Sequence, residues 1–199
     1  MNYSKIFRAL TLTSLLIPFT AHRALAVNYR AFTVAKGAHY STGHLESFFE
    51  KQSMTFHGMF DDSAKYDPQD PSIRGINKFY GYTDCNSLVH NNSARFGWEW
   101  YQNQLLIYAY TYANSSTHDG QLMGAVPLNT DVLYKISNNG DHYDFEYTYQ
   151  DSEQKTVDVK MSAPRGCSDN GGDFRFRLWP YFGGNATAPH DVTIYVDEI

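Results

Sequence analysis

The sequence predicts an all-β fold, a two-sheet antiparallel sandwich or jelly roll, in a chain of 199 residues. Tyrosine and phenylalanine are abundant, with 16 and 13 copies, and strands favour aromatic residues. Short runs of alternating apolar and polar residues are separated by loops rich in Gly, Asn, Asp, Ser and Pro. No stretch after residue 26 sustains helical periodicity. Many short strands at near-regular spacing are typical of sandwiches and jelly rolls.

Residues 1–26 have the pattern of a cleavable secretory signal peptide. Lys5 and Arg8 precede an apolar run over residues 9–19, and Ala24 and Ala26 form a small-x-small end. That run is shorter than the roughly 20 apolar residues that a bilayer span needs, and an uncleaved anchor is the alternative. We expect cleavage after Ala26, a secreted or periplasmic location, and a single domain over residues 27–199.

The charge balance limits the partners. The chain has 16 Lys+Arg against 21 Asp+Glu, and the leader removes three basic residues, which leaves 13 against 21 and a net charge of about −8. An acidic surface disfavours nucleic acid and anionic lipid. Polyanionic polysaccharides are disfavoured for the same reason, unless the fold creates a local basic cleft. Neutral glycans and proteins remain as partners, and nothing after residue 26 is long and apolar enough to span a membrane.

Two hairpins stand out among the expected strands. Strand-like runs over 95–101 and 105–112 have a short polar connection, and runs over 132–137 and 142–149 flank Asn138-Asn139-Gly140-Asp141. Asn-Gly is a strong hairpin signal because both residues tolerate positive φ. Further strands are expected over 53–60, 76–82, 156–161, 174–179 and 191–197, and residues 45–51 can form about two helical turns.

The chain has two cysteines, Cys85 and Cys167. An even count in an oxidising compartment favours one disulfide. Such a bridge closes a loop of about 80 residues and stabilises the fold by roughly 4 kcal/mol. Two separate thiols are the alternative.

From Asn77 onward the order of features resembles the concanavalin A-like lectin/glucanase sandwich. The resemblance rests on the Asn-Gly hairpin, a short strand, a Gly-rich loop, an aromatic strand that ends in Trp179-Pro180-Tyr181-Phe182-Gly183-Gly184, and a final strand over 191–197. It implies an architecture that hosts lectins, glycoside hydrolases, polysaccharide lyases and adhesion modules, and does not choose among them.

Two segments are rich in residues that suit a sugar site, where rings stack on C–H faces and polar groups fix hydroxyls. In the first segment, residues 90–100, alternation places Asn92, Trp98 and Trp100 on one face and Arg95 on the other. The second segment, residues 178–191, offers Tyr181 and His190. Core anchoring of the tryptophans and capping of the last strand by His190 are the alternatives. The leading hypothesis is non-covalent binding of carbohydrate or another extracellular ligand at Asn92, Arg95, Trp98, Trp100, Tyr181 and His190; a structural or adhesion module without a small-ligand site is an alternative.

An enzyme on the same fold is the other alternative. Retaining glycosidases place two carboxylates about 5 Å apart. Asp144 and Glu146 have the required alternation, but a solvated polar face opposite buried aromatic residues is the favoured explanation for them. Lyases of this fold use a Tyr or His to move a proton and an Arg with an amide to neutralise a uronate. His190, Tyr181 and Arg95 are the candidate catalytic residues in that case, although the lyase strand motifs are missing.

A calcium loop is the remaining metal candidate. Asp169, Asn170 and Asp173 surround two glycines, and oxygen ligands on a flexible loop suit Ca²⁺. Turn formation by Asp and Asn explains the same residues. We expect no cofactor.

Overall fold

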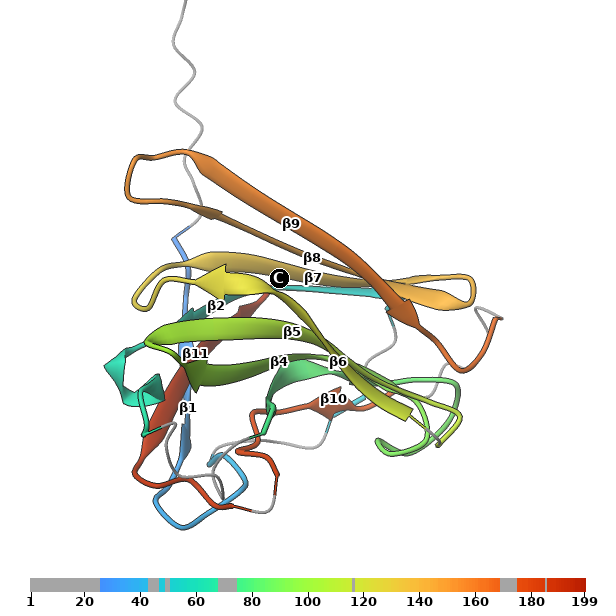
Figure 1. Cartoon of the computed structure of the whole chain (residues 1–199). Coiled ribbons are helices and arrows are strands. Elements are labelled where there is room, and N and C mark those ends of the chain that lie inside the picture. The colour runs from blue at the N-terminus through green and yellow to red at the C-terminus, as the bar shows by residue number, and fades with distance from the viewer. Residues whose placement is uncertain are drawn as a thin grey trace, which may run out of the picture.

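The computed structural model describes residues 26–42, 47–48, 51–67, 75–115, 117–168, 175–184 and 186–199. These residues form two antiparallel sheets packed face to face, which confirms the predicted sandwich (Figure 1). Residues 1–25 of the expected signal peptide over 1–26, most of the expected helix over 45–51 and the candidate calcium loop lie outside the described residues. Among the described residues, no helix is long and apolar enough to cross a bilayer.

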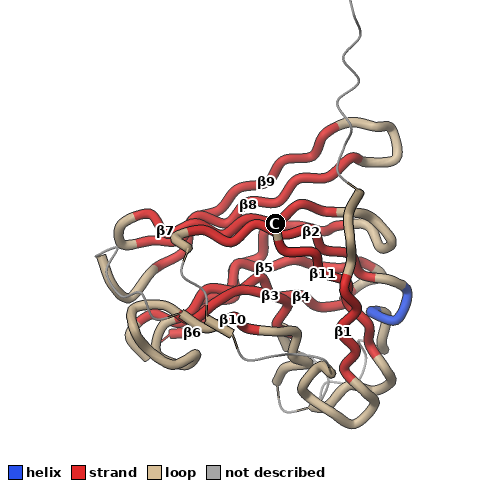
Figure 2. The backbone as a smooth tube through the Cα atoms, turned by 180° about the vertical axis from the view of Figure 1, so that it is seen from behind, coloured by secondary structure: helices blue, strands red, loops and turns tan. Residues whose placement is uncertain are grey.

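The six-stranded sheet has the order β1-β11-β2-β7-β8-β9, and the five-stranded sheet has the order β10-β3-β4-β5-β6. Figure 1 shows β7, β8 and β9 in the upper layer and β4, β5 and β6 in the lower one. Figure 2 shows both layers from behind, with a short 3-10 helix, η1, beside β1 and β11. The elements are β1 (Arg30–Val34), β2 (Ser53–Phe60), η1 (Asp62–Ala64), β3 (Asn77–Thr83), β4 (Ser93–Tyr101), β5 (Gln104–Ala113), β6 (Thr117–Val126), β7 (Val132–Asn139), β8 (His142–Gln150), β9 (Thr156–Pro164), β10 (Arg177–Leu178) and β11 (Val192–Glu198).

Both predicted hairpins are present, with one change of register. The β4–β5 turn consists of Gln102 and Asn103, both at positive φ (49° and 60°), which is the pattern of a type I′ turn. The β7–β8 turn lies one residue later than expected, because Asn139 pairs with His142 and leaves Gly140-Asp141 as the turn. Positive φ is then required only at Gly140 (65°), which glycine adopts without steric cost.

Two strands were not predicted, and one is shorter than predicted. The five residues of β1 pair at the sheet edge with β11, a pairing that no local pattern indicates. Strand β6 contains two glycines and lacks a clear alternation. Of the expected strand over 174–179, the described residues 175–179 contain only the two-residue β10, and Pro180 has no N–H to continue a ladder beyond it.

Aromatic rings from both sheets fill the core. Phe56 of β2 stacks on Tyr134 of β7 with centroids 5.2 Å apart, and it meets Phe79 of β3 edge-on at 5.3 Å. Phe96 of β4 contacts Phe145 of β8 edge-on at 5.1 Å. Edge-to-face pairs add about 0.5–1.5 kcal/mol each beyond their buried area. These rings therefore hold the two sheets together.

One end of the sandwich is fastened by a disulfide and a buried ionic cluster. Cys85 and Cys167 form the predicted bridge, with Cα atoms 5.9 Å apart. Next to it, buried Asp84 accepts hydrogen bonds from Arg165 Nε (2.6 Å), Arg175 Nε (2.8 Å) and Tyr143 OH (3.0 Å). Burial alone would raise the pKa of Asp84, but the hydrogen bonds and the two arginine charges hold that pKa below its usual value. The cluster anchors the start of the loop over residues 84–92.

Candidate functional site

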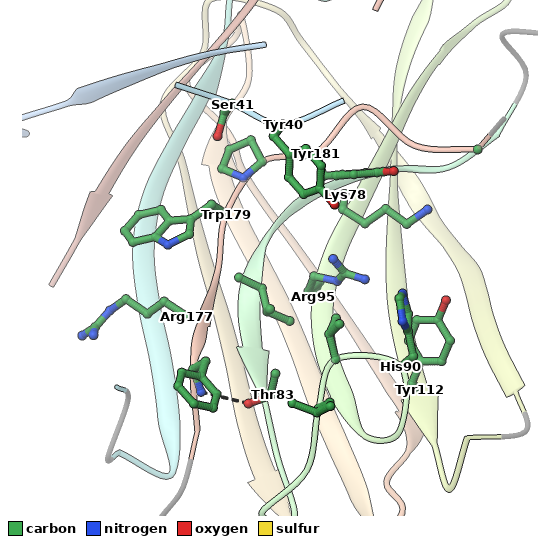
Figure 3. Close-up of a pocket in the computed structure, with 16 residues that line it drawn as sticks. Tyr40, Ser41, Lys78, Thr83, His90, Arg95, Tyr112, Arg177, Trp179 and Tyr181 are labelled. Atoms are coloured by element: carbon green, nitrogen blue, oxygen red, sulfur yellow. Dashed lines mark hydrogen bonds between the residues drawn. The ribbon is translucent and has the colours of Figure 1, made fainter. Parts of the chain in front are cut away.

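A cleft of about 760 Å³ lies on the outer face of the five-stranded sheet, away from the core (Figure 3). Strands β3, β4, β5 and β10 contribute to it, together with the 84–92 loop, the segment around residue 40 and the segment that follows β10. Aromatic and basic side chains predominate in the lining: Tyr40, Tyr112, Phe176, Trp179 and Tyr181, with Lys78, His90, Arg95 and Arg177. None of the described residues that line the cleft carries a carboxylate.

The alternation along β4 separates the core from the cleft. Ala94, Phe96 and Trp98 belong to the core, and Arg95 projects from the opposite face because successive strand residues point to opposite sides. Trp98 is 1% exposed and packs against Phe60 at 5.3 Å. Trp98 is therefore a core residue that cannot contact a ligand, whereas Arg95 lies in the cleft.

A bulge in β3 turns Lys78 toward the cleft. Lys78 pairs with Gly97 and Gly81 pairs with Arg95, so two β3 residues, Phe79 and Tyr80, lie opposite a single residue of β4. Two residues facing one is the geometry of a β-bulge. Both bulged rings are buried in the core. Without the bulge, strict alternation would place Lys78 on the same face as the buried Tyr80, and Lys78 would point into the core.

Lys78 and Arg95 lie close to the same tyrosine ring. Lys78 Nζ is 4.6 Å from the ring centroid of Tyr110, and Arg95 Cζ is 5.6 Å from it. Burial, followed by the nearby Arg95 charge, lowers the pKa of Lys78 to about 8. Burial lowers the pKa of Arg95 to about 10, and Tyr110, Tyr112 and Tyr181 act in the opposite direction. Each of these two cations is therefore desolvated in the fold.

Tyr181 is held next to Lys78 by backbone pairing. The Tyr181 N–H donates to the Lys78 carbonyl at 2.9 Å, and the Lys78 N–H donates to the Tyr181 carbonyl at 2.8 Å. The ring of Tyr181 stacks on His39 with centroids 5.2 Å apart and meets Tyr40 edge-on at 5.0 Å. Tyr40 is 69% exposed, so this end of the cleft presents an accessible aromatic ring.

The opposite part of the cleft combines an imidazole with a phenol. His90, from the 84–92 loop, packs edge-on against Tyr112 of β5 with centroids 5.3 Å apart. In the view of Figure 3, Arg95 lies between Lys78 and the His90–Tyr112 pair, and Arg177 points the other way. Arg177 forms a bidentate ion pair with Glu198 of β11, with both N–O distances 2.8 Å.

Of the six binding residues proposed from the sequence, the structure brings Arg95 and Tyr181 together and places the other four elsewhere. The Asn92 side chain accepts from the Asn114 N–H (2.8 Å) and donates to Ser87 Oγ (3.1 Å), so it braces two loops. His190 Nε2 lies 2.9 Å from the Ser63 carbonyl oxygen, beside η1, and is not among the cleft residues. Its position agrees with a structural role at the start of β11.

Trp100 lies at a second, smaller cavity of about 480 Å³ near η1. Lys65 Nζ is 5.9 Å from its ring, and the backbone N–H of Trp100 donates to Tyr66 OH at 3.1 Å. This tryptophan is half-buried against the core. It is separate from Arg95 and Tyr181, since the two cavities share no lining residue.

The carboxylate pair on β8 is satisfied by its neighbours. Asp144 accepts from Ser162 Oγ (2.7 Å) and Asn139 Nδ2 (2.9 Å), and Glu146 pairs with Lys160 at 2.8 Å. The intervening Phe145 is buried. Asp144 and Glu146 therefore lie on a polar outer face opposite buried aromatic residues, which was the alternative to a glycosidase carboxylate pair.

Sequence reasoning missed several cleft residues, among them Lys78, His90, Tyr112 and Tyr40. An isolated glycine inside a strand pattern indicates a bulge. Gly81 was therefore a sequence signal for the β3 bulge, and a bulge there would have placed Lys78 on the face opposite Tyr80. Tyr112 follows Tyr110 and Tyr108 by alternation, but periodicity cannot say which face of a strand is covered. No local signal indicates that the segment around Tyr40 reaches the cleft.

Comparisons with known proteins define no family. No protein-family model matches the sequence, and no curated protein is significantly similar to it. Among solved structures, the chain is similar to the Bacteroides ovatus xyloglucan PUL GH43B (TM-score 0.46, 11% identity, 75% of this chain and 27% of that one). It is also similar to the alginate lyase from Klebsiella pneumoniae (0.45, 9%, 72% and 56%) and to the carbohydrate binding module CBM66 from Bacillus subtilis (0.31, 11%, 84% and 94%).

These neighbours are carbohydrate-active proteins with sandwich-type folds, but the likeness is too remote to indicate a function. The chain spans about a quarter of the length of the first neighbour and about half of the second. The cleft itself therefore carries the functional argument.

Proposed function

We propose that this protein binds carbohydrate non-covalently in the cleft on the five-stranded sheet. The observation that carries the proposal is the convergence of tyrosine rings and charged donors on one open concave surface. Tyr40, Tyr112 and Tyr181 offer ring faces and edges, and Arg95 and Lys78 offer N–H donors. Rings that cover C–H faces and a few polar groups that fix orientation are what a sugar ligand requires.

The size of the cleft supports the same proposal. Ligand sites commonly enclose about 300–1,000 Å³, and the volume of about 760 Å³ falls in that range. A disulfide such as the Cys85–Cys167 bridge, which joins the start of the 84–92 loop to a distant segment, is typical of proteins from oxidising compartments, and this supports the proposed secreted or periplasmic location. A concanavalin A-like architecture is part of this proposal.

A glycan array, followed by titration of the best glycan, tests the proposal. Tyr40→Ala removes an exposed ring at the cleft and should weaken binding about 2- to 12-fold, since aromatic pairs contribute about 0.5–1.5 kcal/mol. Trp100→Ala is the matched control, because it alters the smaller cavity and should leave the affinity unchanged. Absence of glycan binding by the folded wild-type protein, or a loss confined to Trp100→Ala, would contradict the proposal.

A lyase acting on uronate polysaccharide is the second candidate. It is favoured by Arg95, Tyr181 and His90 lying in one cleft, since a lyase needs a charge partner for the uronate and a group that removes the neighbouring proton. Elimination breaks the glycosidic C–O bond and leaves an unsaturated sugar and a new hydroxyl. Appearance of ultraviolet-absorbing product, lost in His90→Ala, would identify this activity. Binding without product would assign the cleft to recognition alone.

A further inference from the structure

The cleft concentrates positive charge in a protein that is acidic overall. The chain has 21 Asp+Glu against 16 Lys+Arg, yet the described lining of the cleft contains Lys78 and Arg95 and no carboxylate. Arg177 is the informative contrast, since it lines the same cleft and is neutralised by Glu198 at 2.8 Å. The fold thus supplies a counter-charge to one cleft arginine and leaves Arg95 without one among the described residues.

Arg95 occupies an unfavourable position for a cation. Its side chain is 7% exposed, and its Nε has no hydrogen-bond partner among the described residues. The ring of Tyr110, 5.6 Å from Arg95 Cζ, offers a π face in place of an anion. Such a contact compensates only part of the desolvation of a buried charge. An anion that enters the cleft would meet a guanidinium that has already lost most of its water.

Lys78 reinforces this positive field. Its Nζ sits 4.6 Å from the same Tyr110 ring, and it donates one hydrogen bond, to the Ile76 carbonyl, at 2.8 Å. An ammonium has three donors, so Lys78 retains capacity for an anion. The mutual repulsion of Lys78 and Arg95, which contributes to the lowered pKa of Lys78, would be relieved by a negative charge close to both.

We infer that the cleft selects a saccharide that carries a carboxylate, with Arg95 as its main charge partner and Lys78 as the second. This inference rests on the proposed function and specifies its ligand class. The planar guanidinium presents paired donors that match the two oxygens of a carboxylate, and the tyrosine rings at the two ends of the cleft contact the sugar rings. A uronic acid combines both features in one residue. The net negative charge of the chain does not prevent this, because the basic groups are local to the cleft.

The direct test compares an acidic oligosaccharide with its own methyl ester by calorimetric titration. Galacturonate, mannuronate and glucuronate trimers are titrated beside their methyl esters, which keep the sugar and remove the charge. At low salt we expect at least one free acid to bind about tenfold or more tighter than its ester, and the difference to shrink as salt is added. A neutral glucose trimer, a sulfated glucose trimer, which is anionic but carries no carboxylate, and an acidic peptide complete the set.

The variants assign the charge partner. Arg95→Met should abolish the preference of about tenfold for the acid over the ester, and Lys78→Met should reduce it. Lys155→Met is the control: Lys155 forms an exposed ion pair with Glu153 in the β8–β9 turn, so its replacement should leave the preference unchanged. Thermal unfolding monitors the fold, and Arg95→Met should unfold no earlier than wild type because it removes a buried charge without a counter-charge. Arg95→Lys keeps the charge and should retain part of the preference.

The outcomes separate the two proposals. Equal affinity for acid and ester, an unchanged preference in Arg95→Met, or tightest binding of the sulfated trimer or the acidic peptide would overturn the inference. If all uronates fail while neutral glycans bind, the inference falls and the proposed function stands. If no saccharide binds at all, both fall.

Discussion

The guanidinium of Arg95 and the ammonium of Lys78 meet at the ring of Tyr110, where each cation faces a π surface instead of a carboxylate. Functional sites often retain charges in settings that cost stability, because ligand binding depends on them. Burial is also what shifts the pKa of Lys78 to about 8 and of Arg95 to about 10. Of these two cations, Lys78 is therefore the one whose charge changes near pH 8.

Uronate binding should weaken as the pH rises from about 7 to 9. The pKa of Lys78 is lowered to about 8, so its positive charge is present below that pH and lost above it. The facing groups Arg95, Tyr110 and Tyr181 do not titrate there, because the pKa of Arg95 is about 10 and those of both tyrosines are raised by burial. We expect roughly a two- to threefold loss of affinity across this interval, since Lys78 is the second charge partner and Arg95 stays charged, measured by titration calorimetry.

Lys78→Met provides the check on this assignment. The variant should bind more weakly at pH 7 and show little change between pH 7 and 9. A decline of the same size in Lys78→Met would mean that another group in the cleft titrates.

At the scale of the element, the bulge in β3 decides which side chains reach the cleft. It places both Phe79 and Tyr80 in the core and leaves Lys78 on the outer face. Gly81 permits the close approach of β3 and β4 at this point: a Cβ there would lie 2.0 Å from the Ala94 carbonyl oxygen and 2.7 Å from Arg95 Cα. Both of these contacts are with backbone, which cannot rotate away.

Gly81→Ala should therefore lower the free energy of unfolding by about 2–3 kcal/mol, in the range of overpacking substitutions, and weaken ligand binding because Arg95 is displaced. Urea denaturation and titration of the same sample measure both effects. Gly37→Ala is the control, since its Cβ would meet nothing within 4 Å. Its φ of 78° should cost about 1 kcal/mol without affecting binding. Equal losses of stability in the two variants would contradict the close-approach argument.

At the scale of the whole molecule, the loop that carries His90 is joined to distant segments at its base. The Cys85–Cys167 bridge connects positions 82 residues apart, and Asp84 is bonded to both Arg165 and Arg175. These contacts join the start of the loop to the end of β9 and to the segment before β10. One wall of the cleft thus depends on contacts between remote parts of the chain.

The double variant Cys85→Ser/Cys167→Ser should lose about 4 kcal/mol of unfolding free energy, the amount expected for opening a loop of this length. Urea denaturation of wild type with and without a reductant gives an independent estimate, and the reduced protein should match the variant. The Asp84 cluster should keep the variant folded at neutral pH. A change below about 1 kcal/mol would mean that the reduced unfolded chain retains structure.

Much of the architecture was predictable because it is locally encoded. The alternation of Phe96, Trp98 and Arg95 along one strand identified two faces, and Gly140 marked a hairpin whose turn is displaced by one residue. The cysteine count led to the correct bridge. Of the residues proposed from the sequence, only Arg95 and Tyr181 lie in the candidate cleft, because periodicity separates the two faces of a strand but does not say which of them faces the core.

The sequence by itself determined an all-β sandwich, its main hairpins and the disulfide, since period-two alternation, turn residues and an even cysteine count are local or compositional signals. Only the tertiary structure decided that Lys78 joins Arg95, that Tyr181 lies beside Lys78, and that Glu198 neutralises Arg177 and not Arg95. The physical reason is that these juxtapositions arise from a bulge and from strand pairings between residues far apart in the chain. Their energies depend on register and burial, which no local pattern records.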